Sequence, residues 1–376
     1  MTTLNITDHP DLITERAGNG WTIVRLNRPK SLHALDESLA RSIFEVIIYL
    51  ANDAETKAIW LDSSTPKAFC AGGDVRQLRQ MSLDDNAAGA DMFFKEEYAA
   101  DLMIHQYSKP IVVWAEGYVM GGGMGLLMGA PFRIVTPTSK LSMPEINIGL
   151  FPDVGGSRFL AERGLLGLFL GLTGSILDAG DSHTINWATH ISHLTKEAVL
   201  ETLVALDWHA QDSVTGHYHL VADKLAAIHR PLIGEALKNS LDEIAHVCHG
   251  VDFIADYEAI IALADTSSNL WLKQAGNNLK HGSPSTAALT WLLWQWASAA
   301  DRPWAQVFSL EIRLAEWKIR HPDFNEGVRA RLVDKDNKPQ WQVTEVKSLL
   351  QALGGVPETD DESWCEILRK YAILSS

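Results

Sequence analysis

The sequence predicts an α/β fold in its first half, followed by a mainly helical region. Three short β-branched and aromatic runs, each ending in turn residues, are typical of strands, several of them buried: WTIVRLN from Trp21, AIWLDS from Ala58 and PIVVWAEG from Pro110. Helical patterns lie between these runs. Strand and helix therefore alternate, as they do where helices cover a sheet.

The helical pattern between the first two predicted strands begins after Asp36, an acid well suited to cap a helix. Apolar residues follow it at three-to-four-residue spacing, namely Leu39, Ile43, Val46 or Ile47, and Leu50. This spacing predicts a helix with one apolar face, which we expect to pack on the strands.

The pattern changes after ATHISH near residue 188, where long helix-like segments replace the β-branched runs. We place a soft boundary near residues 190 to 200 and predict an α/β core over 1–195 and a mainly helical region over 196–376. Within that region Ser283 precedes Pro284, which is a typical helix start.

The chain of 376 residues is acidic, with a formal net charge of −15, which disfavours nucleic acid and anionic membranes as partners. Its three scattered cysteines, Cys70, Cys248 and Cys365, favour a reducing, cytoplasm-like compartment over a disulfide framework. The first residues show no targeting pattern. The apolar run between Glu116 and Arg133 is shorter than the roughly 20 residues that span a bilayer.

The segment KAFCAGGDV, from Lys67, places Gly72 and Gly73 before Asp74, shortly after a predicted strand. Glycines allow a backbone to approach a ligand closely and to direct its N–H groups at an oxygen. An ordinary strand-to-helix turn capped by Asp74 is the alternative. Cys70 is interpreted as a small buried apolar residue, because no base lies beside it.

The segment GYVMGGGMGL, from Gly117, places a glycine triplet where a strand passes into a helix. A helix N-terminus there would present N–H donors to developing negative charge. Close packing of helix on sheet is the alternative explanation. The phosphate-binding patterns fail, since Met128 stands where a dinucleotide motif needs its third glycine.

The segment MPEINIGLFPDVGG holds two acids, Glu145 and Asp153, in otherwise apolar surroundings. Two carboxylates in one apolar pocket would have separated pKa values, so that one could act as base or nucleophile and the other as proton donor. Helix capping is the alternative for each acid.

Two other kinds of site are disfavoured. Ser157 lacks the final glycine of a serine-hydrolase elbow. No second cluster of metal-ligand residues completes a metal site with His246.

Together and in order, these segments resemble the enoyl-CoA hydratase/isomerase, or crotonase, superfamily. The matching segments are NRPKSLHAL, KAFCAGGDV, GYVMGGGMGL, MPEINIGLFPDVGGS and DFNEGVRA. Within it the chain is most similar to the 3-hydroxyisobutyryl-CoA hydrolase branch, through FFKEEYAADLMIHQYSKP, GLFPDVGG, ATHISH and DFNEGVRARLVDKDNKPQW. The resemblance is dense over about 20–195 and 281–342.

The resemblance implies a spiral of ββα units and an oxyanion hole formed by the backbone N–H groups of Gly73 and Gly122. Hydratases of the superfamily carry a glutamate where this chain has Gly125, so hydration is disfavoured. Glu145 matches the second hydratase glutamate and is expected to be base or nucleophile. Asp153 stands where hydratases have a glycine and is expected to be its partner, as in the hydrolase branch.

The same resemblance suggests the substrate contacts. Glu97 matches a glutamate expected to bind the 3-hydroxyl group, with a solvated helix charge as the alternative. The residues that match CoA-binding segments are Lys30, Leu32, Ala71, Gly72, Gly73, Asp74 and Val75. His33 replaces the asparagine common in that motif, and no role is drawn from it.

The resemblance therefore implies hydrolysis of a short 3-hydroxyacyl-CoA, above all 3-hydroxyisobutyryl-CoA in valine breakdown. CoA is expected as part of the substrate, with no separate cofactor, no metal, no nucleic acid or membrane partner, and a homo-oligomer as one option. A hydratase or isomerase of the same fold and a CoA-ester-binding protein without turnover remain the alternatives.

Overall fold

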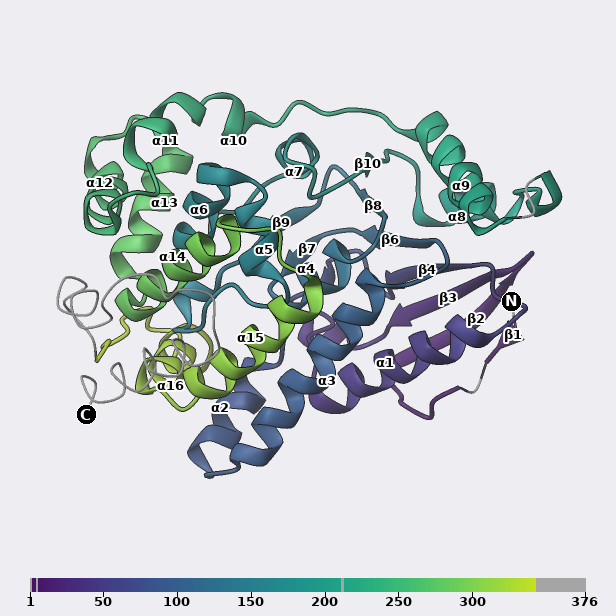
Figure 1. Cartoon of the computed structure of the whole chain (residues 1–376), viewed down its shortest axis with the longest axis horizontal. Helices are drawn as coiled ribbons and strands as arrows, with labels where there is room; N and C mark the ends of the chain where they lie inside the picture. The colour runs from purple at the N-terminus through teal and green to yellow at the C-terminus, as the bar shows by residue number, and fades with distance from the viewer. Residues whose placement is uncertain (1, 5, 211–212, 343–376) are drawn as a thin grey trace. The chain divides into compact units, whose positions relative to one another are not determined.

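The computed structural model describes residues 2–4, 6–210 and 213–342 (Figure 1). The chain forms two compact units, each assembled from separate stretches of sequence. Unit 1 comprises residues 1–73, 95–141 and 177–238, and unit 2 comprises residues 74–94, 142–176 and 239–376. Cys365 and the end of the predicted helical region, 343–376, lie outside the described residues.

Unit 1 is built on a seven-stranded sheet with the order β1-β2-β3-β4-β6-β8-β10. Its strands are β1 (Thr2–Thr3), β2 (Leu12–Gly18), β3 (Trp21–Leu26), β4 (Ala58–Ser63), β6 (Ile111–Ala115), β8 (Phe132–Val135) and β10 (His190–Ile191). Strand β2 pairs antiparallel with both β1 and β3. The remaining neighbours in this order, from β3 and β4 to β8 and β10, pair parallel. The three strands predicted from β-branched runs are confirmed as β3, β4 and β6, and β4 and β6 are buried throughout.

A second sheet of three short strands has the order β5-β7-β9, with β5 (Ala68–Cys70), β7 (Tyr118–Met120) and β9 (Lys140–Ser142). Each short strand follows a strand of the large sheet along the chain, and a helix or helical turn follows each short strand. The chain thus repeats a strand, a strand and a helix, which confirms the expected ββα units.

Helices cover the large sheet of unit 1. Asp36 caps α1 by accepting a hydrogen bond from the Leu39 N–H, and the apolar residues predicted to face the strands are all buried. The helical elements of this unit are η1 (Pro29–Ser31), α1 (Glu37–Asn52), the second half of α3 (Ala87–His105), α4 (Gly122–Met128), α7 (Ala179–Thr184), α8 (Lys196–Val204), η3 (Trp208–Ala210), α9 (Val214–Ile228) and α10 (Glu235–Lys238).

The division expected at residue 195 does not coincide with the compact units, because α8 and α9 belong to unit 1. Leu203 on α8 and Leu225 on α9 join a buried cluster with Trp21, Trp60 and Trp114 of the sheet. The indole N–H of Trp21 also donates to the Leu203 carbonyl at 2.9 Å. This apolar contact keeps the first helices of the predicted helical region with the sheet.

In its described residues, 74–94, 142–176 and 239–342, unit 2 is mainly helical. Its elements are α2 (Val75–Leu83), the first half of α3, η2 (Glu145–Asn147), α5 (Gly156–Ala161), α6 (Gly164–Thr173), α11 (Leu241–Val247), α12 (Phe253–Thr266), α13 (Leu270–His281), α14 (Pro284–Ser298), α15 (Trp304–Lys318), α16 (Pro322–Val328) and η4 (Arg329–Val333). Helices α12 and α13 lie side by side (Figure 1). Helix α14 begins as predicted, with Ser283 accepting from the Thr286 N–H.

Among the residues that the structure describes, no helix combines the length and the apolar character needed to cross a bilayer.

Candidate active site

The first glycine segment follows β5 and is paired with the loop that precedes α1. The Ala71 N–H donates to the Leu32 carbonyl at 3.0 Å, and the Leu35 N–H donates to the Gly72 carbonyl at 2.9 Å. Leu35 and Gly73 form an isolated parallel bridge. Two segments that the resemblance assigns to CoA are therefore held together by backbone hydrogen bonds.

The loop before α1 has an unusual backbone. Leu32 and His33 both have positive φ, 55° and 59°, a region that asparagine adopts more readily than most residues. His33 is buried; its Nδ1 accepts from the Arg28 N–H at 3.0 Å and its Nε2 lies 2.9 Å from the Thr65 hydroxyl. Burial lowers the pKa of His33. This histidine therefore stabilises the loop, while the neighbouring Lys30 side chain is exposed.

The second glycine segment starts α4, as predicted, with Gly121 at φ 48° in the N-cap position. A Cβ on Gly122 would lie 2.1 Å from Glu97 Oε1 and 3.4 Å from the Gly73 N atom. A Cβ on Gly72 would lie 3.5 Å from the Gly122 N atom. The two predicted oxyanion-hole residues are thus neighbours within unit 1, and a side chain at Gly122 would have to displace the Glu97 carboxyl group.

Glu97 stands on α3 and only 3% of its surface is exposed. The alternative that it is a solvated helix charge is therefore wrong. Its carboxyl group lies against Gly122, since Oε1 would be 2.1 Å from a Cβ on that glycine. Gly125, at the position of the hydratase glutamate, is buried in α4 and offers no acid there.

Asp74 caps α2 by accepting a hydrogen bond from the Gln77 N–H. The alternative of a strand-to-helix turn capped by Asp74 is therefore confirmed for this acid. Val75 is the first residue of that helix. Cys70 is completely buried, and burial raises the pKa of its thiol to about 12, so it stays protonated at neutral pH and fits the predicted role of a small apolar residue.

In unit 2, the acids Glu145 and Asp153 lie at the two ends of a mostly buried stretch, and each is 4% exposed. Glu145 is the first residue of η2, whose N-cap is Pro144, and Asp153 precedes Gly155, the N-cap of α5. Neither acid occupies an N-cap position.

The backbone beside Glu145 is tied to the C-terminal motif of the resemblance. The Ser283 N–H donates to the Ile146 carbonyl at 2.9 Å. A Cβ on Gly149 would lie 2.4 Å from the Asp323 carbonyl oxygen, so only glycine allows this close approach. The family segment DFNEGVRA, which begins at Asp323, therefore packs directly on the stretch between the two acids.

A buried network of charged and hydroxyl groups supports that contact. The Lys318 ammonium donates to Ser285 Oγ at 2.6 Å, and the hydroxyls of Ser285 and Ser283 donate to Asp323 Oδ2 at 2.6 and 3.0 Å. Lys318 and Asp323 have no exposed surface. Burial lowers the pKa of Lys318 to about 8, while Asp323 opposes this shift.

Sequence reasoning missed two residues of α15, Lys318 and Glu311. Glu311 accepts hydrogen bonds from the turn that follows Asp153, at the Gly155 and Ser157 N–H groups. Both charges stand at helical spacing with buried Val307 and Leu314. Charged residues at positions of an apolar helix face were the signal that could have identified them.

This fold and these segments define a class of protein. The chain belongs to the enoyl-CoA hydratase/isomerase family, whose family model matches residues 21–353. The solved enoyl-CoA hydratase of Rhodobacter sphaeroides 2.4.1 aligns with a TM-score of 0.77 and 28% identity over 95% of this chain and 97% of that chain. A carnitinyl-CoA dehydratase of Mycobacterium thermoresistibile aligns with a TM-score of 0.80 and 25% identity over 96% of each chain.

Among curated proteins the chain is similar to the mitochondrial 3-hydroxyisobutyryl-CoA hydrolase of Danio rerio. The two are 35% identical over 341 residues, which cover 88% of this chain and 85% of the relative. The resemblance to this branch of the crotonase superfamily, predicted from the motifs, is confirmed.

Proposed function

We propose that this chain hydrolyses the thioester of a short 3-hydroxyacyl-CoA, with 3-hydroxyisobutyryl-CoA as the first substrate to test. Such an activity belongs to valine catabolism. The observation that carries the proposal is the meeting of Gly73, Gly122 and the buried Glu97 carboxyl group within unit 1. The similarity to a 3-hydroxyisobutyryl-CoA hydrolase supports the choice of substrate.

Gly73 and Gly122 are proposed to bind the thioester oxygen through their backbone N–H groups. Attack on the carbonyl carbon moves negative charge onto that oxygen, and preorganised donors stabilise the charge as it develops. One such donor lowers the barrier by roughly 3 to 4 kcal/mol. The closeness of Gly122 to the Gly73 N atom supports this pair of donors.

Glu145 is proposed to act on the carbonyl carbon in one of two ways. As a general base it takes a proton from water, which then attacks. As a nucleophile it forms a mixed anhydride that water cleaves. In both routes water supplies OH to the acid product and H to the CoA thiolate, so the carbon–sulfur bond is replaced by a carbon–oxygen bond. Asp153 is proposed to transfer these protons.

Two residues support hydrolysis rather than hydration. A hydratase needs a second glutamate at the position of Gly125, and this chain has none there. Asp153 occupies a position that is glycine in the hydratases that the chain resembles. The pair of acids that the sequence offers is therefore Glu145 and Asp153.

Glu97 is proposed to bind the 3-hydroxyl group, which its burial beside Gly122 supports. Lys30 is exposed in the loop paired with the Gly72 segment and offers a local cation to CoA phosphate on an otherwise acidic chain. Leu32, Ala71, Asp74 and Val75 complete the proposed CoA segments. If Glu97→Gln left the discrimination against isobutyryl-CoA unchanged, the role of Glu97 would be wrong.

The test is thiol release from 3-hydroxyisobutyryl-CoA, run beside hydration of crotonyl-CoA, on the wild type, Glu145→Gln and Asp153→Asn. We expect fast thiol release that falls by at least about 100-fold in both variants, with negligible hydration. Hydration without thiol release would favour the hydratase alternative. Stabilisation by CoA without either activity would indicate a binding protein.

Hydrolysis in oxygen-18 water tests the anhydride route. Label in the Glu145 carboxylate supports the anhydride, because water must then have attacked the Glu145 carbonyl carbon, and absence of label over many turnovers counts against an anhydride cleaved in this way. The proposed reaction uses water alone as second reactant, without a separate cofactor. The cytoplasmic location and a homo-oligomeric state stay predictions.

A further inference from the structure

Glu311 is a buried acid that no recognised motif contains. It stands in the middle of α15 and has no exposed surface. A carboxyl group is costly to bury unless several donors compensate for lost water. Its contacts must therefore be specific, and all those that follow lie within unit 2.

Both oxygens of Glu311 bind the turn that follows Asp153. Oε2 accepts from the Gly155 N–H at 2.7 Å, and Oε1 accepts from the Ser157 N–H at 3.0 Å and from the Ser157 hydroxyl at 2.5 Å. The carboxyl group thus spans the first residues of α5 and joins them to a helix more than a hundred residues further along the chain.

The turn that Glu311 binds has a strained backbone. Val154 has φ 52° and Gly155 has φ 84°. Positive φ in a β-branched residue costs on the order of 1 to 3 kcal/mol and persists only where surrounding contacts impose it. The Gly156 N–H donates to the Asp153 carbonyl at 2.7 Å, which closes the turn directly beside the acid.

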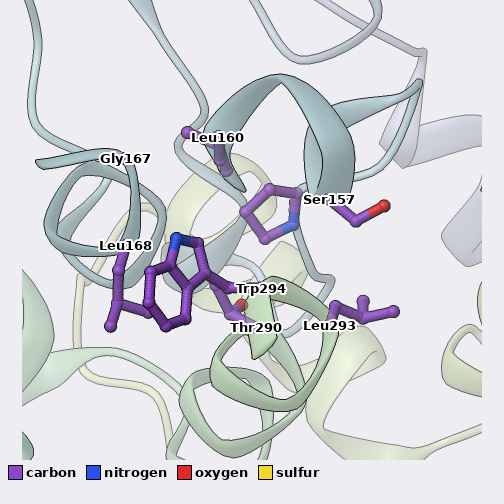
Figure 2. Close-up of a pocket in the computed structure, with 8 residues that line it drawn as sticks. Ser157, Leu160, Gly167, Leu168, Thr290, Leu293 and Trp294 are labelled. Atoms are coloured by element: carbon purple, nitrogen blue, oxygen red, sulfur yellow. The ribbon is translucent and has the colours of Figure 1, made fainter. Parts of the chain in front are cut away.

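The other side of this turn is packed against helices. A cavity of only about 10 Å³ remains between Pro152, Ser157, Leu160 and α14, which is close to the volume needed by one water molecule (Figure 2). Figure 2 shows the Ser157 hydroxyl directed away from this cavity, in keeping with its bond to Glu311. The turn therefore has little space into which it could relax.

We propose that Glu311 is a positioning residue for Asp153: its two oxygens hold the strained turn at Val154 and Gly155 and thereby fix the direction of the Asp153 carboxyl group. This inference rests on the proposed function, in which Asp153 transfers protons. The charge of Asp153 raises the pKa of Glu311, after the larger effect of burial, so the two acids also interact electrostatically.

The chain provides a matched control. Asp256 on α12 is 1% exposed and likewise accepts from two backbone N–H groups, those of His249 at 2.9 Å and Gly250 at 2.7 Å. Gly250 also has positive φ, 69°. Asp256→Asn therefore removes a buried acid from a similar turn that contains no predicted site residue.

The experiment is a double-mutant cycle on kcat for thiol release, with Glu311→Gln and Asp153→Asn, measured on folded protein below the unfolding transition. If Glu311 acts through Asp153, Glu311→Gln lowers kcat by about 10-fold or more in the wild type, with KM changed less than about threefold. In the Asp153→Asn background it lowers kcat by less than about twofold. Asp256→Asn is expected to lower the unfolding midpoint and to leave kcat unchanged.

An equal loss of kcat from Glu311→Gln in both backgrounds would overturn the inference and leave the proposed function intact. Full activity of Asp153→Asn would instead overturn the proposed function, and the positioning role with it. If Glu311→Gln does not fold, Ser157→Ala removes one of the three hydrogen bonds. Ser157→Ala is expected to lower kcat by about two- to fivefold in the wild-type background and to leave kcat unchanged in the Asp153→Asn background.

Discussion

The two units present their predicted site residues in different ways. In unit 1, Gly73 and Gly122 offer backbone N–H groups, and short strands and a neighbouring loop position them. In unit 2, Glu145 begins the short helix η2 and Asp153 lies in the turn before α5, and buried charged side chains of α15 bind beside them. A backbone N–H donor can be held in place by hydrogen bonds to neighbouring backbone, whereas a carboxylate beside a turn needs side-chain anchors.

This difference predicts different sensitivities. The site at Gly122 should fail when a side chain is added, because the Glu97 carboxyl group already takes the space. The carboxylate pair should fail when a distant buried charge is removed, because the loop loses its anchor. Four substitutions test this contrast, from the largest expected effect to the smallest.

Lys318→Met should have the largest effect on stability. Methionine preserves much of the side-chain length, but it removes the buried positive charge that the Ser285 hydroxyl links to Asp323. Leaving one buried charge uncompensated costs about 3 to 5 kcal/mol in the free energy of unfolding, measured by urea denaturation. Lys318→Met combined with Asp323→Asn should regain much of the loss. A loss below about 1 kcal/mol in the single variant would mean that unit 2 does not depend on this charge.

Gly122→Ala should lower kcat by at least about 100-fold, which corresponds to about 2.7 kcal/mol of transition-state stabilisation. The added Cβ would lie 2.1 Å from Glu97 Oε1, so the glutamate and the helix start must move apart. Steady-state thiol release measures the effect. In a Glu97→Ala background the same change should cost less than about threefold. An undiminished cost there would show that the clash with Glu97 is not the cause.

Glu311 should make the stability of unit 2 depend on pH. Burial raises its pKa to about 8, above the value of about 4.3 expected in the unfolded chain. The folded state therefore binds the proton more tightly, and this contribution is complete below about pH 4 and is lost as pH rises towards 8. The slope is at most about 1.4 kcal/mol per pH unit.

Urea unfolding at pH 5, 6.5 and 8 tests this dependence. The stability advantage of the wild type over Glu311→Gln should shrink as pH rises through this range. Parallel curves for the wild type and Glu311→Gln would contradict the prediction.

His33→Asn should have the smallest effect. Asparagine adopts the positive φ of residue 33 readily and its side-chain oxygen can accept from the Arg28 N–H, but the contact with Thr65 is lost. We expect a change in unfolding free energy below about 1 kcal/mol and kcat within about twofold. His33→Val should cost clearly more, since a β-branched residue disfavours positive φ. Equal effects of the two variants would contradict this explanation.

Local signals in the sequence were sufficient for much of the fold. The β-branched runs became β3, β4 and β6, and the caps at Asp36 and Ser283 start helices where predicted. These features depend on side chains within a few residues of each other along the chain. The same holds for the helix that begins at the glycine triplet.

Other features depended on contacts between distant segments. The burial of Glu97 excluded a solvated charge, and the packing of α8 and α9 on the sheet moved them into unit 1. Glu311 and Lys318 belong to no sequence motif, and their partners around Ser157 and Ser285 come from distant segments of the chain.

The sequence by itself determined the family, the alternation of strand and helix, and the residue types at the predicted site, because motif order and hydrophobic spacing are local properties of the chain. Only the tertiary structure decided which residues hold that site in place. The strained turn after Asp153 and the glycine beside Glu97 are stable because segments far apart in sequence pack against them, and no local pattern encodes that packing.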